Sequence, residues 1–276
     1  MKYYYKQRTA GRALLIAVEE NYLPHVQMAI ADGANVRSKR NRKRDKMEGF
    51  TVLHRARSVA IAKALIDAGA RIEAEDSQGR TPIFFVPADV ASLLIGLGAQ
   101  ADTYDCYSIT PMHCADSFEK VMVLARAGAL IDATDCVNGR TALHTVDDVG
   151  AMRALIALGA EIDTPAQDGW TPLHYAIYSG NSECCEVLLR AGADPMALTT
   201  DGSSCIDYAA RASDDQLVHA MNVVVANREA QKLNAGTVQV GSWSPSPSDM
   251  SGDDLLPTGN SQAQPQVQRQ TNVRRL

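Results

Sequence analysis

The chain has 276 residues, enough for one or two compact domains, and its 27 basic and 32 acidic residues give a formal net charge of −5. No stretch approaches the roughly 20 apolar residues of a membrane-spanning helix, and the N-terminus lacks the features of a secretory signal. Six cysteines are too few for a disulfide scaffold. We therefore expect a cytoplasmic protein whose near-neutral total charge argues against bulk nucleic-acid binding.

The N-terminal part predicts an extension over residues 1–11 and a first helical unit that begins near Arg12 and ends at Gly33, where glycine is typical of the left-handed helix terminus. A basic loop, residues 37–46, follows with seven basic side chains and one acidic: Arg37, Lys39, Arg40, Arg42, Lys43, Arg44 and Lys46. The rest of the chain then holds 20 basic and 31 acidic residues, a net charge of −11. The loop is expected to be a nuclear localisation signal, a patch for an anionic partner (nucleic acid, lipid headgroups or an acidic protein), or a solvated insertion without a partner.

Two sequence markers then alternate along the chain. One is a Gly-Ala pair that ends an apolar-periodic stretch, beginning at Gly69, Gly98, Gly128, Gly159 and Gly192. The other is a threonine that suits a helix N-cap, often with proline at the first helical position; it occurs at Thr51, Thr81, Thr110, Thr141 and Thr171, with Ser204 as a degenerate sixth. The regular alternation predicts one supersecondary unit repeated along the chain.

The spacing of the markers also predicts that some units are shortened. Thr171 and Gly192 are 21 residues apart, whereas the same interval is 17 or 18 residues in the four preceding units. The missing residues correspond to the turn between two helices, so we expect a clipped first helix there. Ser58, Ser117 and Asp148 are the expected N-caps of the second helices.

The C-terminal part changes in composition. The segment Ser204–Ala230 has a more polar second helix and is expected to cap the array, and residues 231–276 are expected to form a disordered tail rich in Ser, Pro, Gly and Gln. Within the tail, Trp243 and the segment 253–256 are candidate linear motifs, and Ser244 and Ser246 precede prolines as candidate phosphorylation sites. A plain solubilising tail is the alternative.

The unit Asp168–Asp194, DGWTPLHYAIYSGNSECCEVLLRAGAD, resembles the ankyrin repeat throughout. The resemblance covers about residues 12–230. It implies an all-α solenoid of about seven helix–loop–helix units with projecting hairpin loops. The units would start near residues 12, 51, 81, 110, 141, 171 and 204.

Histidines and cysteines are the residues that could suggest chemistry. Histidine stands three residues after four of the marker threonines, at His54, His113, His144 and His174. This spacing places one in each repeat, and the resemblance implies a structural role, hydrogen bonding between adjacent loops. Cys184 and Cys185 are adjacent on a helix and cannot point at one tetrahedral ion, whereas Cys106 and Cys136 lie on neighbouring loops and are the remaining zinc or redox candidates. With no phosphate loop or nucleophile motif, we expect no catalysis, no cofactor, no metal and no small-molecule substrate.

The resemblance implies a concave binding surface built from the loop tips and the first helices. The residue before each marker lies near a loop tip, and these residues are Phe50, Arg80, Ile109, Arg140, Trp170 and Ser203. Large apolar side chains and arginine are typical interface anchors, although Phe50 and Trp170 equally suit the covering of their own loops. Further candidates on this face are Gln78, Tyr107, Asn138, Gln167, Tyr175 and Tyr178.

The first functional hypothesis is a non-catalytic module (scaffold, adaptor or inhibitor) that binds a protein partner on this concave face. The second is a bacterial host-directed effector, located in the host nucleus or cytosol, whose basic loop is a nuclear or membrane address. The third is a nucleic-acid-linked regulator that uses the same loop.

Overall fold

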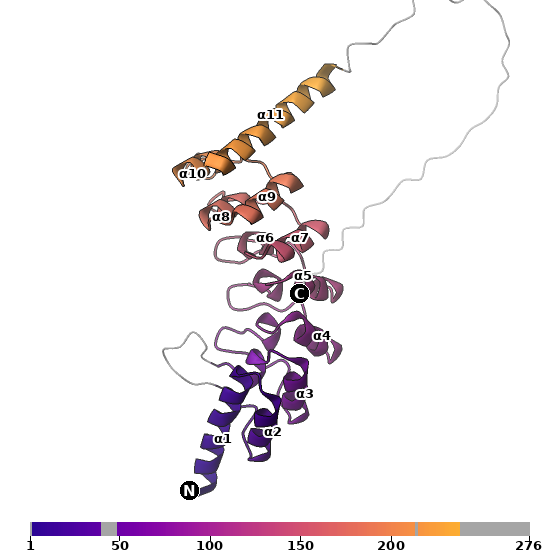
Figure 1. Cartoon of the computed structure of the whole chain (residues 1–276), viewed down its shortest axis with the longest axis vertical. Coiled ribbons are helices and arrows are strands. Elements are labelled where there is room, and N and C mark those ends of the chain that lie inside the picture. Colours follow the sequence, from indigo (N-terminus) through magenta and orange to yellow (C-terminus); the bar gives the residue numbers. More distant parts are fainter. Residues whose placement is uncertain (1, 40–48, 213–214, 238–276) are drawn as a thin grey trace, which may run out of the picture. The chain divides into compact units, whose positions relative to one another are not determined.

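The computed structural model describes residues 2–39, 49–212 and 215–237, which form helices and contain no β-strand. Met1–Ala230 form one compact unit; of the second, Gln231–Leu276, the described residues are the end of a helix. Each repeat contributes a first and a second helical element, and the elements stack in chain order (Figure 1). The first elements are α1 (Lys2–Glu19), η1 (Val52–Arg55), η2 (Pro82–Phe84), η3 (Pro111–Cys114), α6 (Ala142–Thr145), α8 (Pro172–Tyr178) and α10 (Cys205–Arg211). The second are α2 (Leu23–Ala31), α3 (Val59–Asp67), α4 (Ala88–Gly96), α5 (Phe118–Arg126), α7 (Val149–Ala157), α9 (Ser182–Ala191) and α11 (Asp215–Thr237).

The clipping of the central first helices is confirmed. The elements η1, η2, η3 and α6 are three or four residues long, a single turn, whereas α8 and α10 have seven residues each. The second helices begin at the expected N-caps: the side chain of Ser117 accepts from the backbone N–H of Lys120, and that of Asp148 from Ala151. The repeat is therefore shortened at one place while its second helix keeps its length.

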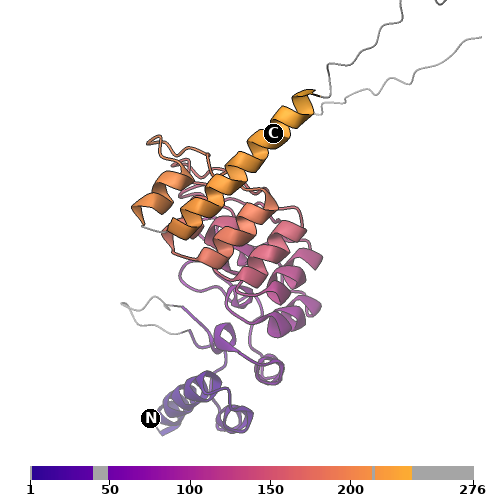
Figure 2. The ribbon, with the colours of Figure 1, turned by 45° about the horizontal axis from the view of Figure 1, so that its top comes forward.

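The second helices carry the core. In Figure 2 they lie side by side in one row. In α3, α4, α5, α7 and α9 a leucine at the same position is fully buried, namely Leu65, Leu94, Leu124, Leu155 and Leu188. Alanines fill much of the remaining core, as an aromatic-poor sequence requires. The glycines that end these helices have positive φ, for example +89° at Gly128, which only glycine adopts without strain.

The hairpin loops form a second connection between repeats. The backbone N–H of Cys106 donates to the carbonyl of Gln78 at 2.8 Å, and Cys136 donates in the same way to Tyr107 at 2.9 Å. The approach is close enough that a Cβ on Gly169 would lie 2.8 Å from the backbone nitrogen of Thr200. Consecutive hairpins are thereby held in one register, which fixes the side chains at their tips.

The helices at both ends extend past the expected bounds of residues 12 and 230, although the first compact unit ends at Ala230. Helix α1 begins at Lys2 rather than near residue 12. The sequence before residue 12 holds one weak helix breaker, Gly11, and a glycine inside a helix costs only about 1 kcal/mol. Helix α11 continues to Thr237, past the expected boundary at 230, since good helix formers such as Gln231 and Lys232 follow it. The tail candidates at 243–246 and 253–256, and residues 40–46 of the basic loop, lie outside the described residues.

Candidate functional site

The marker threonine and histidine form one repeated hydrogen-bonded unit. In His113, Nδ1 lies 3.1 Å from the backbone nitrogen of Thr110 and 2.9 Å from its hydroxyl, while Nε2 lies 3.0 Å from the carbonyl oxygen of Arg140 in the next loop. A carbonyl only accepts, so Nε2 carries the proton, and Nδ1 accepts from the Thr110 N–H and O–H. His54 and His144 make the same bonds, to the carbonyls of Arg80 and Trp170. The expected structural role, hydrogen bonding between loops, is confirmed for these three histidines, whereas the buried Nε2 of His174 has no hydrogen-bond partner among the described residues.

Burial keeps these imidazoles neutral. Desolvation lowers the pKa of His144 from 6.5 to about 4 and outweighs the carbonyl of Trp170, which favours the protonated form. Desolvation also lowers the pKa of His54, His113 and His174. In the second repeat of the shortened series Phe84 replaces the histidine, and the buried hydroxyl of Thr81 has no hydrogen-bond partner among the described residues. Histidines committed in this way are not available as general bases or metal ligands.

Aspartates at the hairpins fix the arginines of the loop tips. Asp76 accepts from the backbone of Gln78 and Arg80, and its other oxygen accepts from the Arg80 guanidinium at 2.8 Å. Arg140 pairs with Asp135 at 2.9 Å. Although burial acts to raise the pKa of Asp135, the N–H of Asn138 and the Arg140 guanidinium lower it below its ordinary value. Each arginine is therefore held as a positioned cation.

The C-terminal repeats bring together four ring-bearing side chains: Trp170 from a hairpin loop, Tyr175 and Tyr178 from α8, and Tyr208 from α10. The Trp170 ring lies 5.1 Å from Tyr175, 5.5 Å from Tyr178 and 5.0 Å from Tyr208, in edge-to-face geometry. The guanidinium of Arg140 lies 6.0 Å from the Tyr175 ring. Tyr178 is 77% exposed, and Trp170 is half-buried. We call Arg140, Trp170, Tyr175, Tyr178 and Tyr208 the tyrosine cluster.

A second group of rings lies in the N-terminal repeats. Phe50 stacks on His54 at 4.9 Å and lies 4.7 Å from Phe85, and the Arg80 guanidinium is 4.7 Å from the Phe85 ring. Phe50 is 7% exposed. The expectation of an exposed anchor at Phe50 is wrong, because Phe85 and Arg80 from the next repeat cover it; the alternative role, packing over its own loop, fits.

The remaining sequence candidates belong to neither ring group. Ile109 is half-buried against the core, and Tyr107 and Gln167 are exposed at hairpin tips. Ser203, the residue before the degenerate marker, is buried. Of the basic loop, Arg37 and Lys39 are described and exposed, and the Arg37 side chain donates to the carbonyl of Gly69 at 2.7 Å.

Tyr208 and Phe85 were missed by the sequence analysis. Both stand four residues after a marker, at the position that Tyr175 occupies after Thr171. In the structure this position meets the residue before the marker, as the Trp170–Tyr175 contact shows. Aligning the repeats at this position as well would have found both rings.

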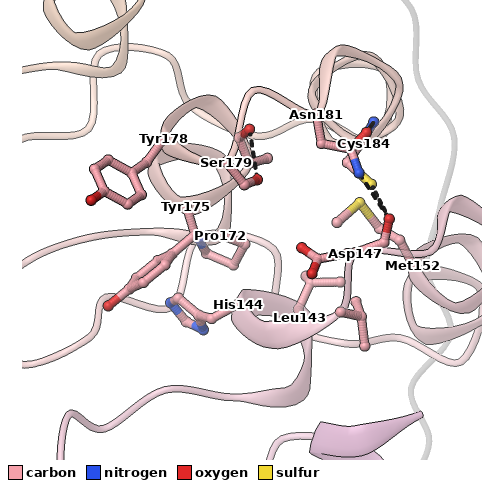
Figure 3. Close-up of a pocket in the computed structure, with 12 residues that line it drawn as sticks. Leu143, His144, Asp147, Met152, Pro172, Tyr175, Tyr178, Ser179, Asn181 and Cys184 are labelled. Atoms are coloured by element: carbon pink, nitrogen blue, oxygen red, sulfur yellow. Dashed lines mark hydrogen bonds between the residues drawn. The ribbon is translucent and has the colours of Figure 1, made fainter. Parts of the chain in front are cut away.

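A small hollow marks the junction between a clipped and a full-length first helix (Figure 3). It has a volume of about 90 Å³ and lies between α6, which ends at Thr145, and the longer α8. Asn181 and Cys184 tie the two repeats together, since both donate to the carbonyl of Asp147, at 2.8 and 3.5 Å. Tyr175 and Tyr178 line the hollow, so the tyrosine cluster reaches the junction between α6 and α8.

The repeat pattern is matched by a known family model. The model, described as ankyrin repeats in three copies, covers residues 116–199 and 145–221. The ankyrin repeat domain of human ASB11 aligns with a TM-score of 0.61 and 26% identity over 76% of this chain and 96% of that domain. Residues 116–221 carry ankyrin repeats, and the fold of most of the chain is that of an ankyrin repeat domain. The predicted family and fold class are confirmed.

Other proteins also match parts of this chain. Human Rabankyrin-5 is 29% identical over 206 residues, which are 66% of this chain and 18% of that protein. The chicken (Gallus gallus) nuclear factor NF-kappa-B p105 subunit is 30% identical over 52% of this chain and 16% of its own length. The chain thus spans less than a fifth of these relatives. The ankyrin repeat domain of Bcl-3, at 22% identity and a TM-score of 0.52, supports the fold.

The ankyrin array is a protein-binding fold. Cys106 and Cys136, the zinc or redox candidates, are exposed free thiols. Among the described residues no group of three or more His, Cys, Asp or Glu has the arrangement of a metal site. No described helix combines the length and the apolar composition that crossing a membrane requires.

Proposed function

We propose that this ankyrin-repeat chain is a non-catalytic scaffold, adaptor or inhibitor that binds a folded protein partner on its loop and first-helix face, centred on the tyrosine cluster. The observation that supports this is the exposure of Tyr178 beside the half-buried Trp170. Tryptophan, tyrosine and arginine are the residues most enriched among interface hot spots. A tyrosine held by ring contacts also loses little conformational entropy when a partner covers it.

The hairpins support the same location. Their backbone hydrogen bonds, such as Gln167 to Asn138 at 2.8 Å, hold the loop tips at fixed spacing. Arg140 is fixed by Asp135, so its guanidinium needs little reorganisation on binding. A preorganised surface of this kind converts more of its contact energy into affinity.

The test begins with a partner identified by crosslinking to the tyrosine cluster in the native host, followed by affinity measurements on purified proteins. Tyr178→Ala should weaken binding at least about tenfold, because it removes an exposed hot-spot ring. The matched control is Phe118→Ala, since Phe118 is also an exposed aromatic residue (45%) but lies on the second-helix row. Equal affinity for wild type and Tyr178→Ala would reject this location of the site.

The two alternatives depend on the basic loop. Its residues 40–46 lie outside the described part of the chain, and the address and nucleic-acid roles stay predictions. Replacing Lys39 and the basic residues of 40–46 with glutamate in a fluorescent fusion tests the address hypothesis, because the location of the fusion in eukaryotic cells should then change. A salt titration with duplex and single-stranded nucleic acid tests the third hypothesis.

A further inference from the structure

A second and larger hollow lies at the other junction between a long and a clipped first helix. Helix α1 ends at Glu19 beside the one-turn η1, and the hollow between them has a volume of about 360 Å³. Its lining residues are Glu19, Phe50, His54, Arg55, Arg57 and Phe85. This volume accommodates a large side chain of a partner, whereas the hollow between α6 and α8 has a volume of only about 90 Å³.

The interior of this hollow is aromatic and held firmly. Phe50 and Phe85 lie 4.7 Å apart, and His54 stacks on Phe50 at 4.9 Å. The Nε2 of His54 is engaged by the carbonyl of Arg80, and desolvation lowers its pKa, so the ring is neutral at pH 7. The Arg80 guanidinium, 4.7 Å from the Phe85 ring, is fixed by Asp76. Phe50 and His54 are buried beneath, and the half-buried Phe85 ring is the apolar surface that suits an aliphatic or aromatic side chain.

The rim of the same hollow is basic. Arg55 pairs with Glu19, and Arg57 is exposed at the point where the clipped helix ends. The charges of Asp76 and Lys39 also act on His54, but neither residue lines the hollow. Of the charged residues that line it, only Glu19 is acidic, and Glu19 pairs with Arg55. The smaller hollow between α6 and α8 has no such basic rim, because its lining includes Asp147 and no lysine or arginine.

We propose that this hollow, on the same face as the proposed partner site, binds a carboxylate-rich segment of the protein partner, with an apolar side chain seated against the Phe85 ring and carboxylates paired with Arg57 and Arg55. The inference rests on the proposed function and adds the chemistry of the partner. Charge complementarity selects an acidic occupant, because a basic segment would meet Arg55 and Arg57. The Phe85 ring selects an acidic segment that also carries a large apolar residue.

The test uses three fluorescein-labelled peptide probes and the full chain, read by fluorescence anisotropy. The first probe has four glutamates around a central Leu-Phe pair; the second replaces the glutamates with lysines; the third replaces Leu-Phe with Ser-Ser. We expect saturable binding of the first probe below roughly 1 mM and at least about tenfold weaker binding of the other two. Raising the salt concentration should weaken the first probe, since the rim is exposed.

Arg57→Glu is the decisive variant, because Arg57 is exposed and its replacement leaves the core intact. It should weaken the first probe about tenfold, since it reverses the charge that pairs with the glutamates. Arg153→Glu on the exposed surface of α7 makes the same charge change away from the hollow and should leave the affinity unchanged. Equal affinities for the two variants, equal binding of the lysine probe, or no saturation would overturn the proposal.

The outcome also separates this inference from the proposed function. If Tyr178→Ala weakens the identified partner while Arg57→Glu leaves both partner and first probe unchanged, the acidic site is rejected and the partner-binding function stands. If Arg57→Glu weakens the first probe while Tyr178→Ala has no effect on the partner, the acidic site stands and the tyrosine cluster is rejected as the centre of the interface.

Discussion

The clipped central repeats and the full-length repeats that follow them use the same local chemistry. The hydroxyl of Thr141 in a clipped repeat lies 2.9 Å from Nδ1 of His144, and that of Thr171 in a full-length repeat lies 2.9 Å from Nδ1 of His174. Second helices of nine and ten residues follow them. What differs is the last turn of the first helix. The comparison indicates that hairpin, capping unit and second helix hold the stack together, while first-helix length shapes the surface and creates hollows where it changes.

The largest expected effect tests whether the second helices carry the core equally in both kinds of repeat. Leu124 on α5 and Leu188 on α9 are both 0% exposed. Replacing either with alanine should lower the free energy of unfolding by roughly 2–5 kcal/mol, through lost burial and a residual cavity. Urea denaturation of both variants measures this. A loss at Leu124 far smaller than at Leu188 would mean that clipping loosens the repeat, contrary to the comparison.

Acid should destabilise the capping unit, that is, the hydrogen-bonded pair of marker threonine and histidine that both kinds of repeat share. The pKa of His144 is 6.5 when unfolded and about 4 when folded, so between these values the unfolded chain binds more protons. Stability is therefore complete above pH 6.5 and is lost as the pH falls towards 4, by about 3 kcal/mol for this one residue. Unfolding free energies measured from pH 7.5 to 4 should show this slope, and His144→Gln should reduce it. A His144→Gln protein with the full acid dependence would contradict the assignment.

A smaller effect separates two clipped repeats from each other. The buried hydroxyl of Thr110 donates to His113, whereas that of Thr81 has no partner because Phe84 stands at the histidine position. Thr110→Val should cost about 1–2 kcal/mol, because it removes the hydrogen bond and leaves Nδ1 under-satisfied. Thr81→Val should be neutral or slightly stabilising, since it removes an unsatisfied buried hydroxyl. Thermal unfolding of the pair provides the matched comparison, and equal losses would argue against the capping unit.

Much of this architecture follows from local signals. The marker spacing predicts the clipped helices, and Ser117 and Asp148 are found at the expected caps. The site is less predictable, because its contacts join different repeats: Trp170 meets Tyr208, 38 residues away, and Phe85 covers Phe50 from the next repeat. Such contacts depend on how closely neighbouring repeats stack, which no single repeat encodes.

Lys120 is the residue that local signals describe least well. A lysine in the first turn of a helix is expected in solvent, yet Lys120 is 1% exposed. It occupies the position of Ile61, Val90 and Cys184 in other second helices. Its Nζ donates to the carbonyl of Phe84, the last residue of η2, at 3.0 Å. The missing turn of the clipped helix leaves that carbonyl without a helical partner, and the lysine reaches it.

Lys120→Met therefore tests whether the clipped helix η2 needs the hydrogen bond from Lys120 to its last carbonyl. Desolvation lowers the pKa of Lys120, so at pH 7 the folded state bears the cost of a buried ammonium that one carbonyl offsets only in part. Methionine keeps the volume and removes that cost, and it should raise the free energy of unfolding by about 1 kcal/mol at pH 7. As the pH rises towards 10.5, the folded wild type releases its proton before the unfolded chain does, so wild-type stability rises and the advantage of methionine shrinks. Urea denaturation at pH 7 and pH 9.5 measures both differences. A loss of stability in Lys120→Met at pH 7 would instead show that the bond to Phe84 outweighs desolvation, and that the clipped helix depends on its lysine.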